Sequence, residues 1–293
     1  MSDLIAVIAP GEMGAGIGRR LRERGARVIT SLAGRSAASA TRAERAGMAA
    51  AASDDEIAAA DIVLSVVPPK DAAGLAERLK PAIARGAKKP IYVDCNAVAP
   101  QTAVAIGAIL QGSGAHYVDG GIIGAPPTPT TAGARLYVSG ERAREVTRLN
   151  SYGLDTRFLD GPIGAASALK MSYAGITKGF TAVSAFMMLG ATRAGCAAEL
   201  HKELAESQAP LLAWLGRQMP KMPPKAYRWV AEMEEIGAFL DGIPDGRAAY
   251  EGFARLYEHI AEAQDASRKP DDAVAQLDAF CAMASETAKR KSA

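Results

Sequence analysis

A glycine-rich turn, Ile8–Gly18 (IAPGEMGAGIG), is the first stretch whose residue types and spacing could do chemistry. Dinucleotide-binding turns follow the pattern G-x-G-x-x-G, because glycine lets the backbone approach a pyrophosphate at the N-terminus of the next helix. Ala9 occupies the first glycine position, and its methyl group is compatible with the turn if φ is negative. The alternative is an ordinary strand-to-helix turn. We predict that a dinucleotide binds here, at Ala9, Pro10, Gly11, Glu12, Met13 and Gly14.

The segment after the second predicted strand indicates which dinucleotide binds. NAD enzymes place Asp or Glu about 20 residues after the turn, where the carboxylate binds the ribose 2′-hydroxyl. No carboxylate occurs from Arg27 to Ala43. Hydroxyl groups and an arginine suit a 2′-phosphate, which a carboxylate would repel. We therefore predict NADP as the cofactor, bound by Thr30, Ser31, Arg35 and Ser36; the alternative is that Arg35 is only a solvated charge at a helix start.

The elements that would position this turn alternate between strand and helix. Apolar and β-branched runs predict strands at 4–8, 27–30, 62–67, 91–94, 117–119 and 135–139. The segments 14–24, 41–46, 71–84 and 98–110 between them predict helices. This alternation is typical of a doubly wound, mostly parallel sheet with helices on both faces. We predict an α/β fold whose N-terminal Rossmann domain, residues 1–162, binds NADP.

No strand is predicted after about residue 162. An apolar stretch, 165–194, predicts a helix of about 30 residues, which would span about 45 Å. Helical patterns follow at 198–219, 227–241, 246–266 and 271–288. We predict that residues 163–293 form an all-α domain for substrate binding and dimerisation, and that the long helix docks two subunits in a homodimer.

Composition excludes several other classes of protein. A chain of 293 residues with 49% hydrophobic and 23% charged residues is ordinary for a globular protein of two domains. A net charge of +2 gives no reason to expect binding to nucleic acid or a membrane surface. No apolar run approaches the length of a membrane span, and no signal peptide is evident. Three scattered cysteines and three scattered histidines predict neither disulfides nor a metal site, so we expect a cytoplasmic protein with a small-molecule substrate.

Four motifs occur in an order that resembles the β-hydroxyacid dehydrogenases, relatives of 6-phosphogluconate dehydrogenase that include 3-hydroxyisobutyrate dehydrogenase. They are GEMG in the turn, IVLSVVPP, VDCNAVAP and GPIGAASALKMSYAG. The resemblance covers the chain to about residue 195 and fits its helical second half. It implies an NADP-dependent oxidoreductase that transfers hydride between the nicotinamide and a hydroxy acid or carbonyl substrate.

The resemblance also assigns roles to individual residues. Lys170, in the run SALKMSYA, is placed as the general acid/base that exchanges the hydroxyl proton. The alternative is a lysine that extends from a partly exposed helix to solvent. Asn96 is placed near the nicotinamide ribose, although an asparagine can equally stabilise its own turn. Val67 and Pro68 could pack against the cofactor or only end their strand.

Two departures from the family pattern affect the expected substrate site. The family usually has an asparagine four residues after the lysine. Here that position is Ala174, and the residue before it is Tyr173. The family loop D-A-P-V-S-G-G reads DGGIIGA here, at Asp119–Ala125, so that Ile123 replaces a serine expected to bind a substrate carboxylate. Both losses make the expected site more apolar. A bulkier or less polar carbonyl substrate would suit such a site. The predicted substrate residues are Ile123, Gly124, Ala125, Tyr173, Ala174 and Arg228, the last of which could instead form a surface ion pair.

Two alternative functions stay open. Imine and ketone reductases are similar to this chain in architecture. The lost serine and asparagine favour this alternative, whereas Lys170 argues against it. A catalytically silent NADP-binding protein is the other alternative, because a fold does not determine a function.

Overall fold

The structure is a computed structural model that describes residues 2–131, 133–264 and 272–291, with side chains in the last helix described as far as Met283. The chain divides into two units, the first ending at Tyr173 and the second beginning at Ala174. The predicted boundary at residue 162 precedes helix α7 (Ala165–Ala174). Hydrogen bonds from the start of α7 to strand β6 explain why this helix belongs with the first unit.

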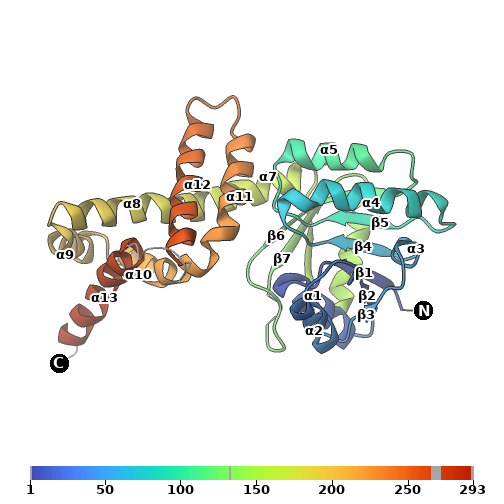
Figure 1. The fold of residues 1–293 in the computed structure, drawn as a ribbon, viewed down its shortest axis with the longest axis horizontal. Helices are drawn as coiled ribbons and strands as arrows, with labels where there is room; N and C mark the ends of the chain where they lie inside the picture. Colours follow the sequence, from blue (N-terminus) through green and yellow to red (C-terminus); the bar gives the residue numbers. More distant parts are fainter. Residues whose placement is uncertain (1, 132, 265–271, 292–293) are drawn as a thin grey trace. The chain divides into compact units, whose positions relative to one another are not determined.

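The first unit is built on an eight-stranded sheet with the order β3-β2-β1-β4-β5-β6-β7-β8 (Figure 1). Neighbouring strands are parallel except for β6 and β7, so the predicted mostly parallel Rossmann sheet is confirmed. The strands are β1 Leu4–Ile8, β2 Arg27–Thr30, β3 Ala49–Ala50, β4 Ile62–Ser65, β5 Ile91–Asp94, β6 His116–Ile123, β7 Arg135–Ser139 and β8 Asp155–Phe158.

Helices cover both faces of this sheet, as the alternating sequence predicts (Figure 1). Helices α4 and α5 lie on one face, and α1 and α2 lie on the other. The helices of the first unit that precede α7 are α1 Glu12–Glu23, α2 Ala37–Arg45, α3 Asp54–Ala58, α4 Ala72–Arg85, α5 Pro100–Leu110 and α6 Ala143–Val146.

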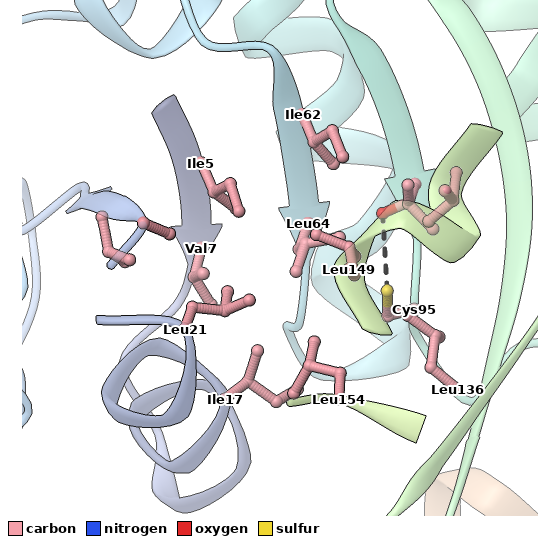
Figure 2. Packing of buried hydrophobic residues seen from close by; sticks show 14 of the residues in the cluster. Ile5, Val7, Ile17, Leu21, Ile62, Leu64, Cys95, Leu136, Leu149 and Leu154 are labelled. Atoms are coloured by element: carbon pink, nitrogen blue, oxygen red, sulfur yellow. Dashed lines mark hydrogen bonds between the residues drawn. The ribbon is translucent and has the colours of Figure 1, made fainter. Parts of the chain in front are cut away.

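Alternating side chains of the central strands fill two separate hydrophobic layers. Ile5 and Val7 of β1 pack with Ile17 and Leu21 of α1 on one face (Figure 2). Ala6 and Ile8 point to the other face, toward residues of α4 and α5. A strand buried on both faces reads as a continuous apolar run, which is why the sequence identified these strands.

The second unit is helical among its described residues, in agreement with the predicted all-α region. Its helices are α8 Phe180–Arg193, α9 Ala197–Ser207, α10 Ala209–Gln218, α11 Ala226–Phe239, α12 Gly246–Ala263 and α13 Ala273–Lys291. The single helix predicted at 198–219 is two helices, separated at Gln208. Pro210 lies in the first turn of α10, a position where proline is tolerated but through which a helix cannot continue unbroken.

The long helix is continuous over Ala165–Arg193 and contains a π-helical turn at Gly175–Gly179. The Tyr250 hydroxyl approaches both ends of this turn, because a Cβ added at Gly175 or Gly179 would lie 3.0 or 2.9 Å from it. The two glycines therefore allow α12 to pack closely against the turn.

The same helix is long and apolar enough to pass as a membrane span by length and composition, which the sequence analysis did not expect. Of its most apolar window, 56% is buried inside the protein. Core helices of globular proteins have this property too, so the helix is weak evidence for a membrane. No other helix in the described ranges passes this test.

Candidate cofactor-binding and catalytic site

The glycine-rich turn connects β1 to α1 and has the geometry of a phosphate-binding turn. Helix α1 begins at Glu12, with Gly11 as its N-cap. A Cβ added at Gly14 would lie 2.0 Å from the carbonyl oxygen of Ala9, so only glycine allows the helix to pack this closely on the turn. A Cβ added at Gly11 would meet nothing within 4 Å, so this position faces open space, where a pyrophosphate could approach.

Ala9 fits the turn in place of the usual first glycine. It is buried, and it does not have a positive φ; among the described residues other than glycine, only Asp245 does. The Ala9 amide donates to the Val66 carbonyl oxygen at 3.2 Å, which ties the turn to the end of β4. The residues of the turn therefore fit a dinucleotide.

Asn96 joins the carboxyl ends of β4 and β5. Its side-chain oxygen accepts a hydrogen bond from the Val67 amide at 2.6 Å, and its amide nitrogen donates to Ser65 Oγ at 2.8 Å and to Asp94. Val67 is buried and Pro68 is exposed. The Asn96 side chain thus shapes the edge of the sheet where a nicotinamide ribose would lie, and its placement in the site stays a prediction.

Two buried aspartates follow on neighbouring strands. Asp94 of β5 and Asp119 of β6 are register partners. Burial raises the pKa of Asp94 to about 6, and the charge of Asp119 acts in the same direction. Hydrogen bonds from Asn96 and Tyr117 oppose this rise in the pKa.

Asp119 anchors the helix that carries Lys170. Its Oδ2 accepts hydrogen bonds from Ser139 Oγ at 2.9 Å, from the Gly164 amide at 2.9 Å and from the Ser167 amide at 3.0 Å. Its Oδ1 accepts from Ser167 Oγ at 2.6 Å. The sequence analysis treats Asp119 as the first residue of a substrate loop, whereas the structure places it inside β6 as the anchor of α7.

The Lys170 side chain starts at the carboxyl end of the sheet, where the cofactor turn also lies. A Cβ added at Gly121 of β6 would lie 2.7 Å from the Ala166 carbonyl oxygen and 3.0 Å from Lys170 Cβ. Gly121 therefore allows α7 to pack directly on the strand, beyond the level at which β5 ends. Lys170 is half-buried in this position.

The four residues predicted to bind a 2′-phosphate differ in their surroundings. Thr30 is fully buried, and its hydroxyl donates to the Val7 carbonyl oxygen at 2.7 Å. Ser31 Oγ accepts from Arg78 Nη2 at 2.8 Å. Arg35 is partly exposed, and Ser36 is the exposed N-cap of α2. The neighbouring strand and helix α4 thus engage the first two hydroxyls, and Arg35 and Ser36 face outward.

The predicted substrate residues fall in both units. Ile123 is the buried last residue of β6, and Gly124 and Ala125 are exposed after it, Gly124 with a φ of 125°. Tyr173 is 51% exposed near the end of α7. In the second unit, Ala174 is buried and Arg228 is exposed on α11, its guanidinium 5.7 Å from the Tyr227 ring centroid.

Two features of the site escape the sequence analysis. The anchor formed by Ser139 and Ser167 around Asp119 joins residues too far apart in sequence for any spacing to reveal it. Arg42 contacts the cofactor turn, since its Nε donates to the Pro10 carbonyl oxygen at 3.1 Å. Its helical spacing from Ser36 and Ser39 could have indicated it. Among the described residues, no group of three or more His, Cys, Asp or Glu side chains could hold a metal ion.

Comparison with known families supports the Rossmann fold of the first unit and its NAD-binding domain. Residues 4–150 match the model of the NAD-binding domain of 6-phosphogluconate dehydrogenase. Residues 191–260 match a domain family of unknown function. No curated protein matches the chain.

Three solved structures share the fold over most of the chain. A conserved protein of unknown function, described as similar to 3-hydroxyacid dehydrogenases, is 28% identical with a TM-score of 0.68, covering 89% of this chain and 98% of its own. The 3-hydroxyisobutyrate dehydrogenase of Mycobacterium tuberculosis, solved with L-serine, is 16% identical with a TM-score of 0.70, covering 96% and 99%. An imine reductase variant from Myxococcus stipitatus, in complex with NAD⁺, is 20% identical with a TM-score of 0.57, covering 96% and 99%.

Proposed function

The chain belongs to the family defined by the NAD-binding domain of 6-phosphogluconate dehydrogenase, and from this premise we propose that it is an NADP-dependent oxidoreductase acting on a hydroxy acid or carbonyl substrate. The nicotinamide, when bound, supplies or accepts the hydride. Lys170 acts as the acid/base in this proposal, and the exposed backbone at Gly124 and Ala125 contributes to substrate binding.

The packing of α7 on β6 is the observation that carries the proposal. Ligands of doubly wound sheets bind outside the carboxyl ends of the strands. The turn after β1 and the carboxyl ends of β4, β5 and β6 share this edge, because these strands are parallel. Lys170 Cβ starts beside Gly121 at the same edge, so its Nζ can reach a substrate held against the nicotinamide.

In the direction of oxidation, Lys170 Nζ accepts the proton of the substrate hydroxyl while the carbon loses hydride. In the direction of reduction, Nζ returns that proton to the developing alkoxide. The Asp119 anchor holds α7 on β6 and so determines where the Lys170 side chain begins. Lys170 needs this positioning because a general base must lie within hydrogen-bonding reach of the proton it takes.

Reduction of imines or bulkier ketones is the second candidate. Ile123 and Ala174 stand where the resemblance expects polar side chains, and both are buried apolar residues. Each of these residues offers fewer polar contacts to a substrate carboxylate than the side chain that the resemblance expects there. Similarity to an imine reductase is compatible with this candidate, although at 20% identity it shows only the shared fold. A silent NADP-binding protein is the third candidate.

Lys170→Ala tests the proposal, with Lys202→Ala on the exposed surface of α9 as the matched control. We expect the purified protein to bind NADPH more tightly than NADH in a fluorescence titration. With NADP(H) and a panel of hydroxy acids, ketones and cyclic imines, Lys170→Ala should lower kcat by about 10²- to 10⁴-fold, the usual contribution of a general acid/base. NADPH affinity should stay nearly unchanged, and Lys202→Ala should behave as the unmodified protein.

Other outcomes separate the candidates. Turnover of cyclic imines without hydroxy acids would favour the second candidate. Cofactor binding with no turnover of any class would favour the silent protein. Unchanged turnover in Lys170→Ala would reject Lys170 as the acid/base.

We also propose a homodimer, on the basis of one apolar face of the long helix. Ile176, Phe180, Val183 and Met187 are between 39% and 72% exposed and recur every three or four residues. This spacing places them on one face of the helix. No charged residue occurs from Phe180 to Thr192, so a second copy could cover this face without burying a charge.

A further inference from the structure

Arg42 lies between the cofactor turn and the segment that follows β2. It projects from the middle of α2 and is partly buried. Its Nε donates to the Pro10 carbonyl oxygen at 3.1 Å, and its Nη2 donates to Ser39 Oγ at 3.0 Å. These two bonds fix the guanidinium beside the turn that would hold the pyrophosphate.

The first turns of α2 place hydroxyl groups beside this arginine. Ser36, Ser39 and Arg42 follow one another at intervals of three residues, so Ser39 is adjacent on the helix surface to both of the others. Ser36 Oγ and Ser39 Oγ lie 3.3 Å apart, and Arg42 contacts the second of them. In a Rossmann domain the adenosine ribose lies between the glycine-rich turn and the carboxyl end of β2. Arg42 contacts the turn that forms one side of this interval.

The charge of Arg42 has no carboxylate partner within the described part of the chain. Arg78 is a useful contrast on the other side of the same loop, because it contacts Ser31 but also pairs with Asp54 at 2.6 Å. A guanidinium that already has a carboxylate partner gains less from a phosphate than an unpaired one. Arg42 is therefore the better phosphate ligand of the two.

We propose that Arg42 is a specificity-determining residue that binds the 2′-phosphate of NADP, together with Arg35 and the hydroxyls of Ser36 and Ser39. This inference rests on the proposed preference for NADP. It also moves the phosphate site toward α2, because the buried Thr30 hydroxyl already donates to Val7, and Ser31 is bound by Arg78. Arg42 approaches from the helix, whereas Arg35 belongs to the loop before it.

A purely structural role is the competing explanation, since the bond to Pro10 also fastens α2 to the turn. The two roles predict different losses. A structural fastener supports the binding of NADPH and NADH alike, whereas a 2′-phosphate ligand supports only NADPH.

Arg42→Gln distinguishes them, with Arg45→Gln as the matched control. Arg45 lies on the same helix, is exposed and loses the same charge. Each protein is titrated with NADPH, NADH, adenosine 2′,5′-bisphosphate and 5′-AMP, and thermal unfolding confirms that each variant is folded. We expect Arg42→Gln to weaken NADPH and the bisphosphate on the order of tenfold to a hundredfold, which is the usual effect of losing a charge-assisted hydrogen bond. NADH and 5′-AMP should change less than about threefold, well below one charge-assisted bond.

Four results would overturn the inference, and they separate it from the proposed function. Equal losses for NADPH and NADH in Arg42→Gln would leave Arg42 as a structural fastener and keep the NADP preference. An NADPH preference that persists in Arg42→Gln, or that falls equally in Arg45→Gln, would also reject the role of Arg42. The NADP preference of the unmodified protein would stand. No preference for NADPH in the unmodified protein would reject both the NADP assignment and the role of Arg42.

Discussion

At the scale of single residues, the sequence identifies residue types but not the neighbours that engage them. The absence of a carboxylate after β2 is visible in the sequence and supports the NADP proposal. The hydroxyls of Thr30 and Ser31 are equally visible, yet the chain folds so that Val7 and Arg78 bind them. Both partners are distant in sequence, so no local pattern predicts their contacts. The contact of Arg42 with Pro10 is equally distant in sequence, although the helical spacing of Arg42 from Ser39 is a local signal.

The raised pKa of Asp94 makes stability depend on pH. The carboxyl group has a pKa of about 6 in the folded protein and about 3.9 in an unfolded chain. Between these values the folded state binds more protons than the unfolded state, so the free energy of unfolding should fall as the pH rises from about 4 to 6. Asp94→Asn should remove this part of the dependence in urea unfolding at a series of pH values. A profile as steep in Asp94→Asn as in the unmodified protein would assign the titration to another group.

At the scale of elements, strands buried on both faces are the easiest to predict. The bounds of β1, β2, β5 and β7 agree with those expected from their apolar runs. Strand β8 lies outside the predictions, because Asp155 and Arg157 alternate with Thr156 and Phe158 at the edge of the sheet. Strand β6 continues to Ile123 because β7 pairs with it in antiparallel register, which turns most of the expected substrate loop into strand.

The anchoring of α7 gives a prediction at this scale. Asp119→Ala leaves four buried donors without their acceptor, so we expect a loss of about 3–5 kcal/mol in the free energy of unfolding. Asp119→Asn keeps one oxygen that can accept from the Gly164 and Ser167 amides, so it should cost about 1–2 kcal/mol. Urea unfolding measures both losses. Equal costs for the two variants would show that the oxygen at this position does not hold the helix.

Asp119→Asn also tests whether anchoring affects catalysis. Asp119→Asn, measured where it is fully folded, should lower kcat more than it changes the Kd of NADPH, because α7 carries Lys170 and the cofactor turn lies on another element. A change in cofactor affinity alone would contradict this division of roles.

At the scale of the whole molecule, the sequence predicts an α/β region followed by helices, and the structure agrees. The division at Tyr173 could not be predicted, because the long helix crosses it without a break and its apolar residues look alike on both sides. Burial distinguishes the faces of this helix from one another. Part of the helix is buried within the protein, and the face formed by Ile176, Phe180, Val183 and Met187 is exposed.

The proposed homodimer is testable through this face. Val183→Glu combined with Met187→Glu would place two charges in an apolar interface, so the double variant should be monomeric at concentrations at which the unmodified protein is a dimer. Val104→Glu is the matched control, because Val104 is a 52% exposed apolar residue on α5 and is not part of this helix. Sedimentation or light scattering gives the mass of each protein. An unmodified protein that is monomeric, or a double variant as dimeric as the control, would show that two copies do not meet along this helix face.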